Sequence, residues 1–329
     1  MVLDTALLDD LLRQGEETAW RRLVETTLEI TSAPLTPSNA VAEVSRRERA
    51  VASLDHLLAG SAWDLWSTFG GAVERTSAAL VRWWDEQVGG RAVLILDGLS
   101  LRELPWLLQG AAERGFQTHL VEVHASELPG ETNPFARALG FQSRSQLQNN
   151  SAGQAHRLTP AATESANLAW KDSAGLVDSS PNWAFWHHWP DRKLHDSCGA
   201  GEGLEALTRD AVDQLTSEDF WSLVARLATG RRLLVTSDHG YAATGGFPDA
   251  SPDVGQFLKA AFSSGRNAPG AGDAGPFVPP VAMSLAGSSG PHHLALGRRK
   301  WKSQGGYPTL THGGLSLLEV LCPFLELTK

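Results

Sequence analysis

Leu233-Leu234-Val235-Thr236-Ser237-Asp238-His239-Gly240 is the stretch that decides the fold. Its apolar run has the length of a buried β-strand, and it ends in an aspartate, a histidine and a glycine. A short strand without polar alternation is typical of a parallel sheet covered by helices on both faces. In open sheets of this kind ligands bind at the carboxyl ends of the strands. The stretch therefore predicts an α/β fold with a polar site where this strand ends.

Two further segments carry the same combination of an acid or imidazole with glycine. The apolar run 91–96 ends in Asp97-Gly98, and Thr311-His312-Gly313-Gly314 lies near the C-terminus. Glycine allows the backbone to turn sharply and to approach a ligand. Carboxylate and imidazole donors without thiolates suit zinc, manganese or magnesium. Together the three segments predict a metal site.

Strand and helix patterns alternate from residue 91 onward, which indicates βαβ units and a mostly parallel sheet flanked by helices. Residues 142–181 are polar and poor in strong strand patterns, 264–276 form a Gly/Pro-rich connection, and the apolar segment 315–327 returns to the core. The expected elements are a strand at 91–96, a helix near 101–114, a strand at 117–123, a helix after Pro134, a strand at 182–187, a helix at 203–229 and a strand at 232–237.

Residues 1–90 have apolar positions at helical spacing and end at Gly89-Gly90, a pair that breaks a helix. We expect two parts: a helical accessory segment, 1–90, suited to binding a protein partner, and a catalytic domain, 91–329.

Composition restricts the class of protein. No apolar stretch of the 329 residues approaches the roughly 20 needed to span a bilayer. The acidic N-terminus does not resemble a secretory signal, and two distant cysteines, Cys198 and Cys322, fit a reducing compartment, so we expect a cytoplasmic protein without a membrane partner. The net charge of −9 argues against a broadly basic nucleic-acid clamp. The cluster 298–302 (Arg-Arg-Lys-Trp-Lys) is an exception, and it suits either a phosphate contact or a solvated turn.

Seven residues make up the candidate site. Two divalent ions roughly 4 Å apart need about this many protein ligands. Each residue also has an ordinary structural interpretation: Asp97 and Thr132 as helix caps, Asp238-His239 as a capped turn, and His312 as a turn or core histidine. In chain order the seven are Asp97, Thr132, Asp191, His195, Asp238, His239 and His312.

These motifs, in this order, resemble the alkaline phosphatase superfamily, and within it the PglZ domain. The resemblance covers residues 91–329 and includes Asp97-Gly98, Pro129-x-x-Thr132, Asp191-x-x-x-His195, Ser237-Asp-His-Gly240 and the C-terminal Thr311-His-Gly-Gly-Leu-Ser316 with the later Pro323. It implies an alkaline phosphatase-like core with two divalent metal ions, zinc first and manganese or magnesium as alternatives. One ion would be held by Asp97, Thr132, Asp238 and His239, and the other by Asp191, His195 and His312.

The resemblance further implies a metal-dependent phosphodiesterase or phosphohydrolase with Thr132 as the nucleophile, acting on nucleotides or nucleic acid in phage defence of the Bacteriophage Exclusion type. The sequence departs from the family at Arg102, which follows Asp97-Gly98 later than the family's arginine does. A scaffold that binds metal or nucleotide without turnover and recruits defence proteins through residues 1–90 is the alternative. The sequence leaves DNA, RNA, cyclic nucleotides and small phosphoesters open as substrates.

Overall fold

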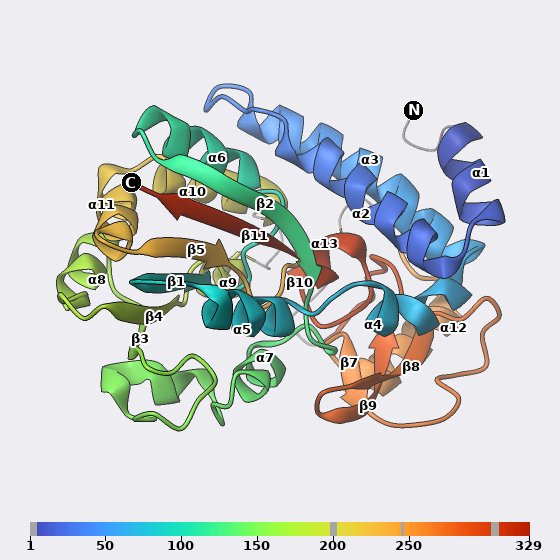
Figure 1. Cartoon of the computed structure of the whole chain (residues 1–329). Helices are drawn as coiled ribbons and strands as arrows, with labels where there is room; N and C mark the ends of the chain where they lie inside the picture. The colour runs from blue at the N-terminus through green and yellow to red at the C-terminus, as the bar shows by residue number, and fades with distance from the viewer. Residues whose placement is uncertain (1–4, 198–202, 245–246, 304–308) are drawn as a thin grey trace.

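A six-stranded sheet forms the centre of the computed structural model, which describes residues 5–197, 203–244, 247–303 and 309–329. The strand order is β2-β11-β5-β1-β4-β3 (Figure 1). β1 pairs in parallel with β4 and β5, and β3 with β4, whereas β11 runs antiparallel to both of its neighbours. The expected α/β fold with a mostly parallel sheet is confirmed. The strands are β1 (Arg91–Leu96), β2 (Gln117–Ala125), β3 (Ala162–Ala166), β4 (Asn182–His187), β5 (Arg232–Thr236) and β11 (Leu321–Thr328).

Helices cover both faces of this sheet. Alternate residues of β1 enter different cores: Ala92, Leu94 and Leu96 face one, and Val93 and Ile95 face the other, as the two-residue period of a strand requires. Burying a leucine side chain contributes about 1.5–3 kcal/mol, so each face is anchored by several such residues. The first core includes α6 (Leu104–Glu113), α8 (Trp170–Leu176), α10 (Gly203–Leu215) and α11 (Glu218–Ala228), and the second includes α5 (Thr76–Glu86), α7 (Thr132–Ala138) and η2 (Arg144–Asn150).

The N-terminal segment is helical, as expected. Its aromatic side chains Trp20, Trp66 and Phe69 are fully buried against one another, with ring centroids 4.7–5.3 Å apart. The same apolar cluster includes residues of β2, β9 and α13, so these helices pack directly on the rest of the chain. The division of the chain at residue 90 stays a prediction. The elements are α1 (Thr5–Arg13), α2 (Glu16–Ser32), α3 (Ala40–Gly60), η1 (Trp63–Thr68) and α4 (Phe69–Ala72).

The polar region 142–181 contains a strand that the sequence pattern did not indicate. β3 has the sequence Ala-Thr-Glu-Ser-Ala and lies at the edge of the sheet, paired only with β4. An edge strand packs fewer apolar neighbours than a central one, so its sequence carries a weak strand pattern. The helix expected at 203–229 is also divided: α10 ends at Leu215, and Ser217 caps α11 by accepting a hydrogen bond from the Phe220 amide at 3.3 Å.

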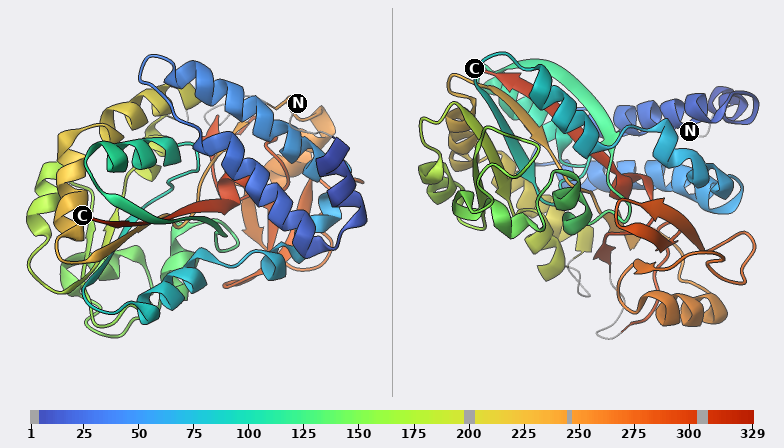
Figure 2. Two further views of the ribbon diagram at one scale, coloured as in Figure 1. Left: turned by 45° about the horizontal axis from the view of Figure 1, so that its top comes forward. Right: turned by 60° about the horizontal axis from the view of Figure 1, so that its bottom comes forward.

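A second, three-stranded sheet begins within the segment 264–276, where a Gly/Pro-rich connection was expected, and continues beyond it. It has the order β7-β9-β8 and packs with α12 (Pro252–Phe262) around a small apolar core. Figure 2 shows this unit at one end of the molecule, beyond the ends of the main strands. Its strands are β7 (Asn267–Pro269), β8 (Ala282–Gly287) and β9 (Gly290–Ala295); the short elements that remain are β6 (Ala242–Ala243), α9 (Asp191–Asp196), β10 (Leu310–Thr311) and α13 (Leu317–Val320).

Among the described residues, no helix combines the length and the apolar character that crossing a membrane requires.

Candidate metal centre

Segments that follow neighbouring strands bring the candidate residues to one edge of the sheet. Asp97 directly follows β1, and Asp238 and His239 follow β5 one residue beyond its end. Asp191 and His195 lie on α9, which begins four residues after β4. Since β4, β1 and β5 are adjacent and parallel, their carboxyl ends meet at the same place. Thr132 begins α7 and His312 follows β10, and both reach this edge from other parts of the chain.

A first group of ligand atoms comes from Asp97, Asp191 and His239, whose donor atoms all lie within 4.8 Å of one another. His239 Nε2 is 3.6 Å from Asp97 Oδ1 and 3.5 Å from Asp238 Oδ2. The Thr132 hydroxyl donates a hydrogen bond of 3.3 Å to Asp97 Oδ1. The set that the resemblance assigns to the first ion thus lies together, and Asp191 joins it.

A second group consists of Asp191, His195 and His312, as the resemblance implies. The Nε2 atoms of His195 and His312 lie 3.4 and 3.5 Å from the two carboxylate oxygens of Asp191. The rings of His239 and His312 stack with centroids 4.2 Å apart, which places the two groups side by side. Asp191 belongs to both groups, whereas the sequence assigned it to one.

Backbone carbonyls orient two of the imidazoles. His239 Nδ1 lies 2.9 Å from the Gly240 carbonyl oxygen, and His312 Nδ1 lies 3.0 Å from that of Gly130. A carbonyl only accepts, so each Nδ1 carries a proton, and each Nε2 is the nitrogen that faces the carboxylates. A carbonyl that holds Nδ1–H in this way orients Nε2 as the metal-binding nitrogen.

Two glycines let the loops approach one another. Gly98 has φ +74°, and a Cβ there would lie 3.2 Å from the Cβ of Asp191. A Cβ on Gly240 would lie 2.2 Å from the carbonyl oxygen of Leu318, so no larger residue fits behind His239. The glycine-flanked motifs of the sequence therefore have a steric cause.

The capping interpretations do not match the contacts in the structure. α6 begins at Leu104 with Glu103 at its N-cap, so Asp97 caps no helix there. Thr132 is the first residue of α7, whose N-cap position is Glu131. Asp238 Oδ1 accepts the amide of Gly98 at 3.0 Å, which joins two loops far apart in the sequence and is not a cap of its own turn.

Four buried polar atoms of the centre make no hydrogen bond, although the first of them lies in an ion pair with Arg144: Asp97 Oδ2, Asp191 Oδ1, Asp238 Oδ2 and His239 Nε2. A buried polar atom without a partner costs about 1–3 kcal/mol, and more when it is charged. Burial disfavours the Asp191 carboxylate, but the hydrogen bond from His195 and the neighbouring imidazoles of His312 and His239 outweigh it and hold the pKa of Asp191 below its ordinary value. Unpaired lone pairs that converge from carboxylates and neutral imidazoles fit divalent cations.

Arg144 is a residue of the site that sequence analysis missed. Its guanidinium forms an ion pair with Asp97 Oδ2, and the charges of Asp238 and Asp191 also act on it. The residue begins η2, in a stretch without any recognisable motif, so no sequence signal marks it. Arg102, which the sequence suggested as the counterpart of the family's arginine, is buried elsewhere and ion-paired with Glu48 at 2.8 Å.

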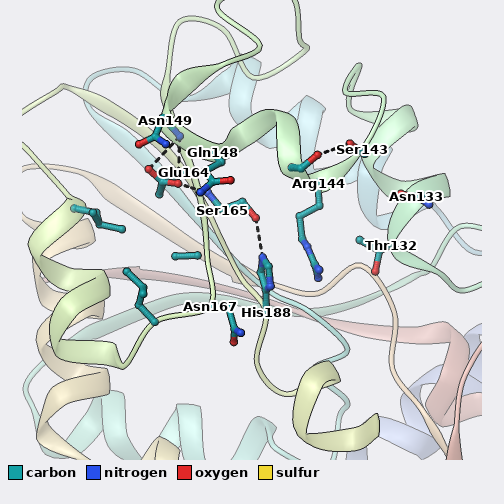
Figure 3. Close-up of a pocket in the computed structure, with 14 residues that line it drawn as sticks. Thr132, Asn133, Ser143, Arg144, Gln148, Asn149, Glu164, Ser165, Asn167 and His188 are labelled. Atoms are coloured by element: carbon teal, nitrogen blue, oxygen red, sulfur yellow. Dashed lines mark hydrogen bonds between the residues drawn. The ribbon is translucent and has the colours of Figure 1, made fainter.

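A cavity of about 660 Å³ opens beside Thr132 and Arg144 (Figure 3). Amides, hydroxyls and the carboxylate of Glu164 line most of it. His188 borders the cavity with its Nε2 3.0 Å from the Ser165 hydroxyl, and burial together with Arg144 lowers its pKa to about 4. The cavity therefore combines these polar groups with apolar surface from Leu168 and Leu176, and the guanidinium lies at the end nearest the metal centre.

The sequence matches no protein-family model and no curated protein. Among solved structures, the chain is similar to murine ectonucleotide pyrophosphatase/phosphodiesterase 5, described as an inactive form in complex with AMP: identity is 14% over 73% of this chain and 88% of that one, with a TM-score of 0.45. The human protein of that name is 13% identical over 72% of this chain and 87% of that one, with a TM-score of 0.44. A phosphonoacetate hydrolase from Sinorhizobium meliloti, in complex with phosphonoformate, is 12% identical over 72% of this chain and 89% of that one, with a TM-score of 0.41. Likeness at this level bears on neither the activity nor the substrate of this chain.

Proposed function

We propose that this chain is a metal-dependent hydrolase of phosphodiesters, with Thr132 as its nucleophile. The observation that carries the proposal is the convergence of three aspartates, two of them fully buried, and three histidines, with atoms that make no hydrogen bond, next to a threonine hydroxyl. The order of these residues along the chain supports an alkaline phosphatase-like enzyme of the PglZ type. Two divalent ions, zinc before manganese or magnesium, would be held by the two groups that share Asp191.

Bound divalent ions would supply charge neutralisation on the phosphoryl oxygens and on the attacking and leaving oxygens. The Thr132 Oγ1 forms a bond to phosphorus as the bond from phosphorus to the leaving ester oxygen breaks. Asp97 Oδ1, 3.3 Å away, takes the proton of the attacking hydroxyl, and the leaving oxygen takes a proton from water. Arg144 stabilises the negative charge of the phosphoryl group from the cavity side. Water then hydrolyses the phosphothreonine.

The cavity beside Thr132 supports a substrate with an organic group attached to the phosphate. A volume of about 660 Å³ holds a ligand of nucleoside size, and its amides and hydroxyls suit a polar one. We propose nucleotides or nucleic acid as the substrate class, and a place in phage defence beside other proteins that contact residues 1–90, in the cytoplasm. The PglZ-like order of motifs supports this role.

Metal analysis and turnover by the same preparations test the proposal. Wild type, Thr132→Ala and the control Thr118→Ala, an exposed threonine, are assayed with bis-p-nitrophenyl phosphate and p-nitrophenyl phosphate in Zn²⁺, Mn²⁺ and Mg²⁺. We expect diester turnover by wild type and the control, and a loss of about 10³-fold or more in Thr132→Ala with metal still bound. Undiminished turnover in that variant contradicts the role of Thr132 as the nucleophile. Bound metal without turnover of any ester favours the scaffold.

A further inference from the structure

A second cavity, of about 650 Å³, lies between α12 and the segment 300–303. Lys259, Lys300 and Lys302 line it, and no carboxylate does. In contrast, Glu164 borders the cavity beside Thr132, and Asp196 and Asp210 border a third cavity of about 390 Å³. Three lysines without an acid among the lining residues are unusual in a chain of net charge −9. Such a concentration of positive charge favours an anionic ligand.

The backbone that carries Lys300 and Lys302 is held in place by contacts of the residues beside them. Trp301 is 5% exposed, packs against Phe262 and donates a hydrogen bond of 2.8 Å from its indole to the Ser263 carbonyl. The Ala250 amide donates to the Lys300 carbonyl at 3.2 Å, which ties the segment to the chain before α12. Because side chains alternate along an extended segment, a buried Trp301 directs Lys300 and Lys302 to the opposite side. Residues 300–302 of this sequence cluster therefore form one side of the cavity.

Lys300 forms an ion pair at the rim of this cavity. Its ammonium lies 3.0 Å from the carboxylate of Asp249, whose side chain is 60% exposed. Lys259 and Lys302 line the same cavity and supply its remaining positive charge.

Basic residues continue from this cavity toward the metal centre. Lys300 and Trp301 also border a narrow gap whose other lining residues include Arg299 and Thr311, and Thr311 precedes His312. Arg299 Nε is buried and has no hydrogen-bond partner, and burial lowers the pKa of its guanidinium. A buried donor without a partner points to an acceptor that binds there.

We propose that this cavity binds backbone phosphates of a single-stranded nucleic acid whose scissile phosphodiester lies at the metal centre. The inference rests on the proposed function, since it assigns that enzyme a polynucleotide substrate. A cavity of this volume holds a ligand of drug size, about one or two nucleotides. The apolar side chains of Ala250 and Pro252 along the same cavity suit the sugar and an unpaired base more than a bare phosphate chain.

Strand binding is measured on the full chain in a Thr132→Ala background, which limits cleavage of the probe. Fluorescence anisotropy of a labelled 12-nucleotide single-stranded DNA compares this protein with Lys259→Glu/Lys302→Glu and with the control Arg21→Glu/Lys171→Glu, an equal charge change at exposed sites. We expect the Kd to rise about tenfold or more in the cavity variant and less than about twofold in the control. The slope of log Kd against log salt should fall by about 1.4, since each phosphate contact on a single strand contributes roughly 0.7.

Equal strand binding by the cavity variant and its parent overturns the inference, as does the absence of binding at 50 mM salt. Displacement by inorganic polyphosphate as effective as by unlabelled strand, per phosphate, also overturns it, because the site would then recognise charge alone. Turnover of bis-p-nitrophenyl phosphate separates the two proposals. A protein that turns over this small diester but binds no strand contradicts only the inference. One that binds strand through the lysines and turns over no ester contradicts only the proposed function.

Discussion

The molecule contains two clusters of buried charge, the metal centre and a network beneath α3. The network consists of Glu48, Asp55, Arg102 and Arg298, all of them at most 6% exposed. Arg102 donates two hydrogen bonds of 2.8 Å to Glu48, and Arg298 contacts both Glu48 and Asp55. Asp55 also accepts the Leu317 amide at 2.8 Å. Every carboxylate of this network therefore has a guanidinium partner.

The metal centre has three carboxylates, one more than the network, but fewer guanidinium partners for them. Asp97, Asp191 and Asp238 are served by one guanidinium, that of Arg144, and each keeps an oxygen without a hydrogen bond. In the network, burial disfavours the charge of Glu48, yet Arg102 and Arg298 outweigh it and lower its pKa. The difference teaches that paired charge fixes a structure, whereas carboxylates that converge at a sheet edge with few cationic partners suit a divalent cation.

The largest expected effect is at the metal centre. Asp238→Asn keeps the oxygen that accepts the Gly98 amide but removes the charge of the unpartnered oxygen. We expect bound metal to fall and diester turnover to drop about 10³-fold or more, because the metal and its charge stabilisation are lost together. Elemental analysis and turnover are compared with Asp85→Asn, an exposed aspartate that should leave both unchanged. Full metal content in Asp238→Asn removes this residue from the centre.

The next largest expected effect is a loss of stability when the buried network loses an arginine. Arg298→Met leaves Asp55 without its guanidinium and Glu48 with one of two, and breaking a buried pair in this way typically costs about 3–5 kcal/mol. The free energy of unfolding in urea measures the loss. Arg46→Met is the matched control, because Arg46 is 60% exposed and pairs with Glu43 on the helix surface, where a pair is worth about 0.5 kcal/mol or less. Equal losses in the two variants contradict the role of the network.

The sequence indicated the parts of this comparison that depend on local pattern. β1 and β5 are continuous apolar runs, and the acids that follow them meet because parallel neighbours end at the same edge. Gly98 and Gly240 are required by close contacts with other loops, which is why glycine accompanied each acid or imidazole.

The parts that depend on tertiary packing could not be indicated in this way. Arg144 reaches Asp97 only because η2 is held over β3, where the Thr163 hydroxyl bonds the Leu147 carbonyl at 2.9 Å and Glu164 accepts the Asn149 amide at 3.2 Å. The pairing of Arg102 with Glu48 joins residues 54 positions apart. Neither contact leaves a periodicity or motif in the chain.

A pH dependence of stability sharpens the comparison further. Burial raises the pKa of Glu103, whose carboxylate accepts the Tyr241 hydroxyl at 2.7 Å, to about 7. A carboxyl with a raised folded pKa stabilises the fold fully below its ordinary pKa of 4.5, and this contribution is lost as pH rises through 7. The shift corresponds to roughly 3 kcal/mol. Between pH 5 and pH 8 the free energy of unfolding should therefore fall by about this much more in wild type than in Glu103→Gln.

The control for this pH effect is Glu113→Gln, which changes an exposed glutamate of the same helix and should keep the pH dependence of wild type. A Glu103→Gln profile parallel to wild type would show that the carboxyl titrates normally.

The smallest expected effect is on the free energy of unfolding of the metal-free protein, and its sign differs between the two clusters. In EDTA, Asp238→Asn should raise the free energy of unfolding by about 1–2 kcal/mol, because it removes one buried charge that lacks a partner. Asp55→Asn should lower it, because it removes the partner of Arg298. With saturating Zn²⁺ the first sign inverts, since only the wild type gains the full free energy of binding. Urea unfolding with and without metal measures all four values. If Asp238→Asn destabilises the metal-free protein as Asp55→Asn does, Asp238 is a paired structural charge, and the distinction between the clusters fails at its most direct point.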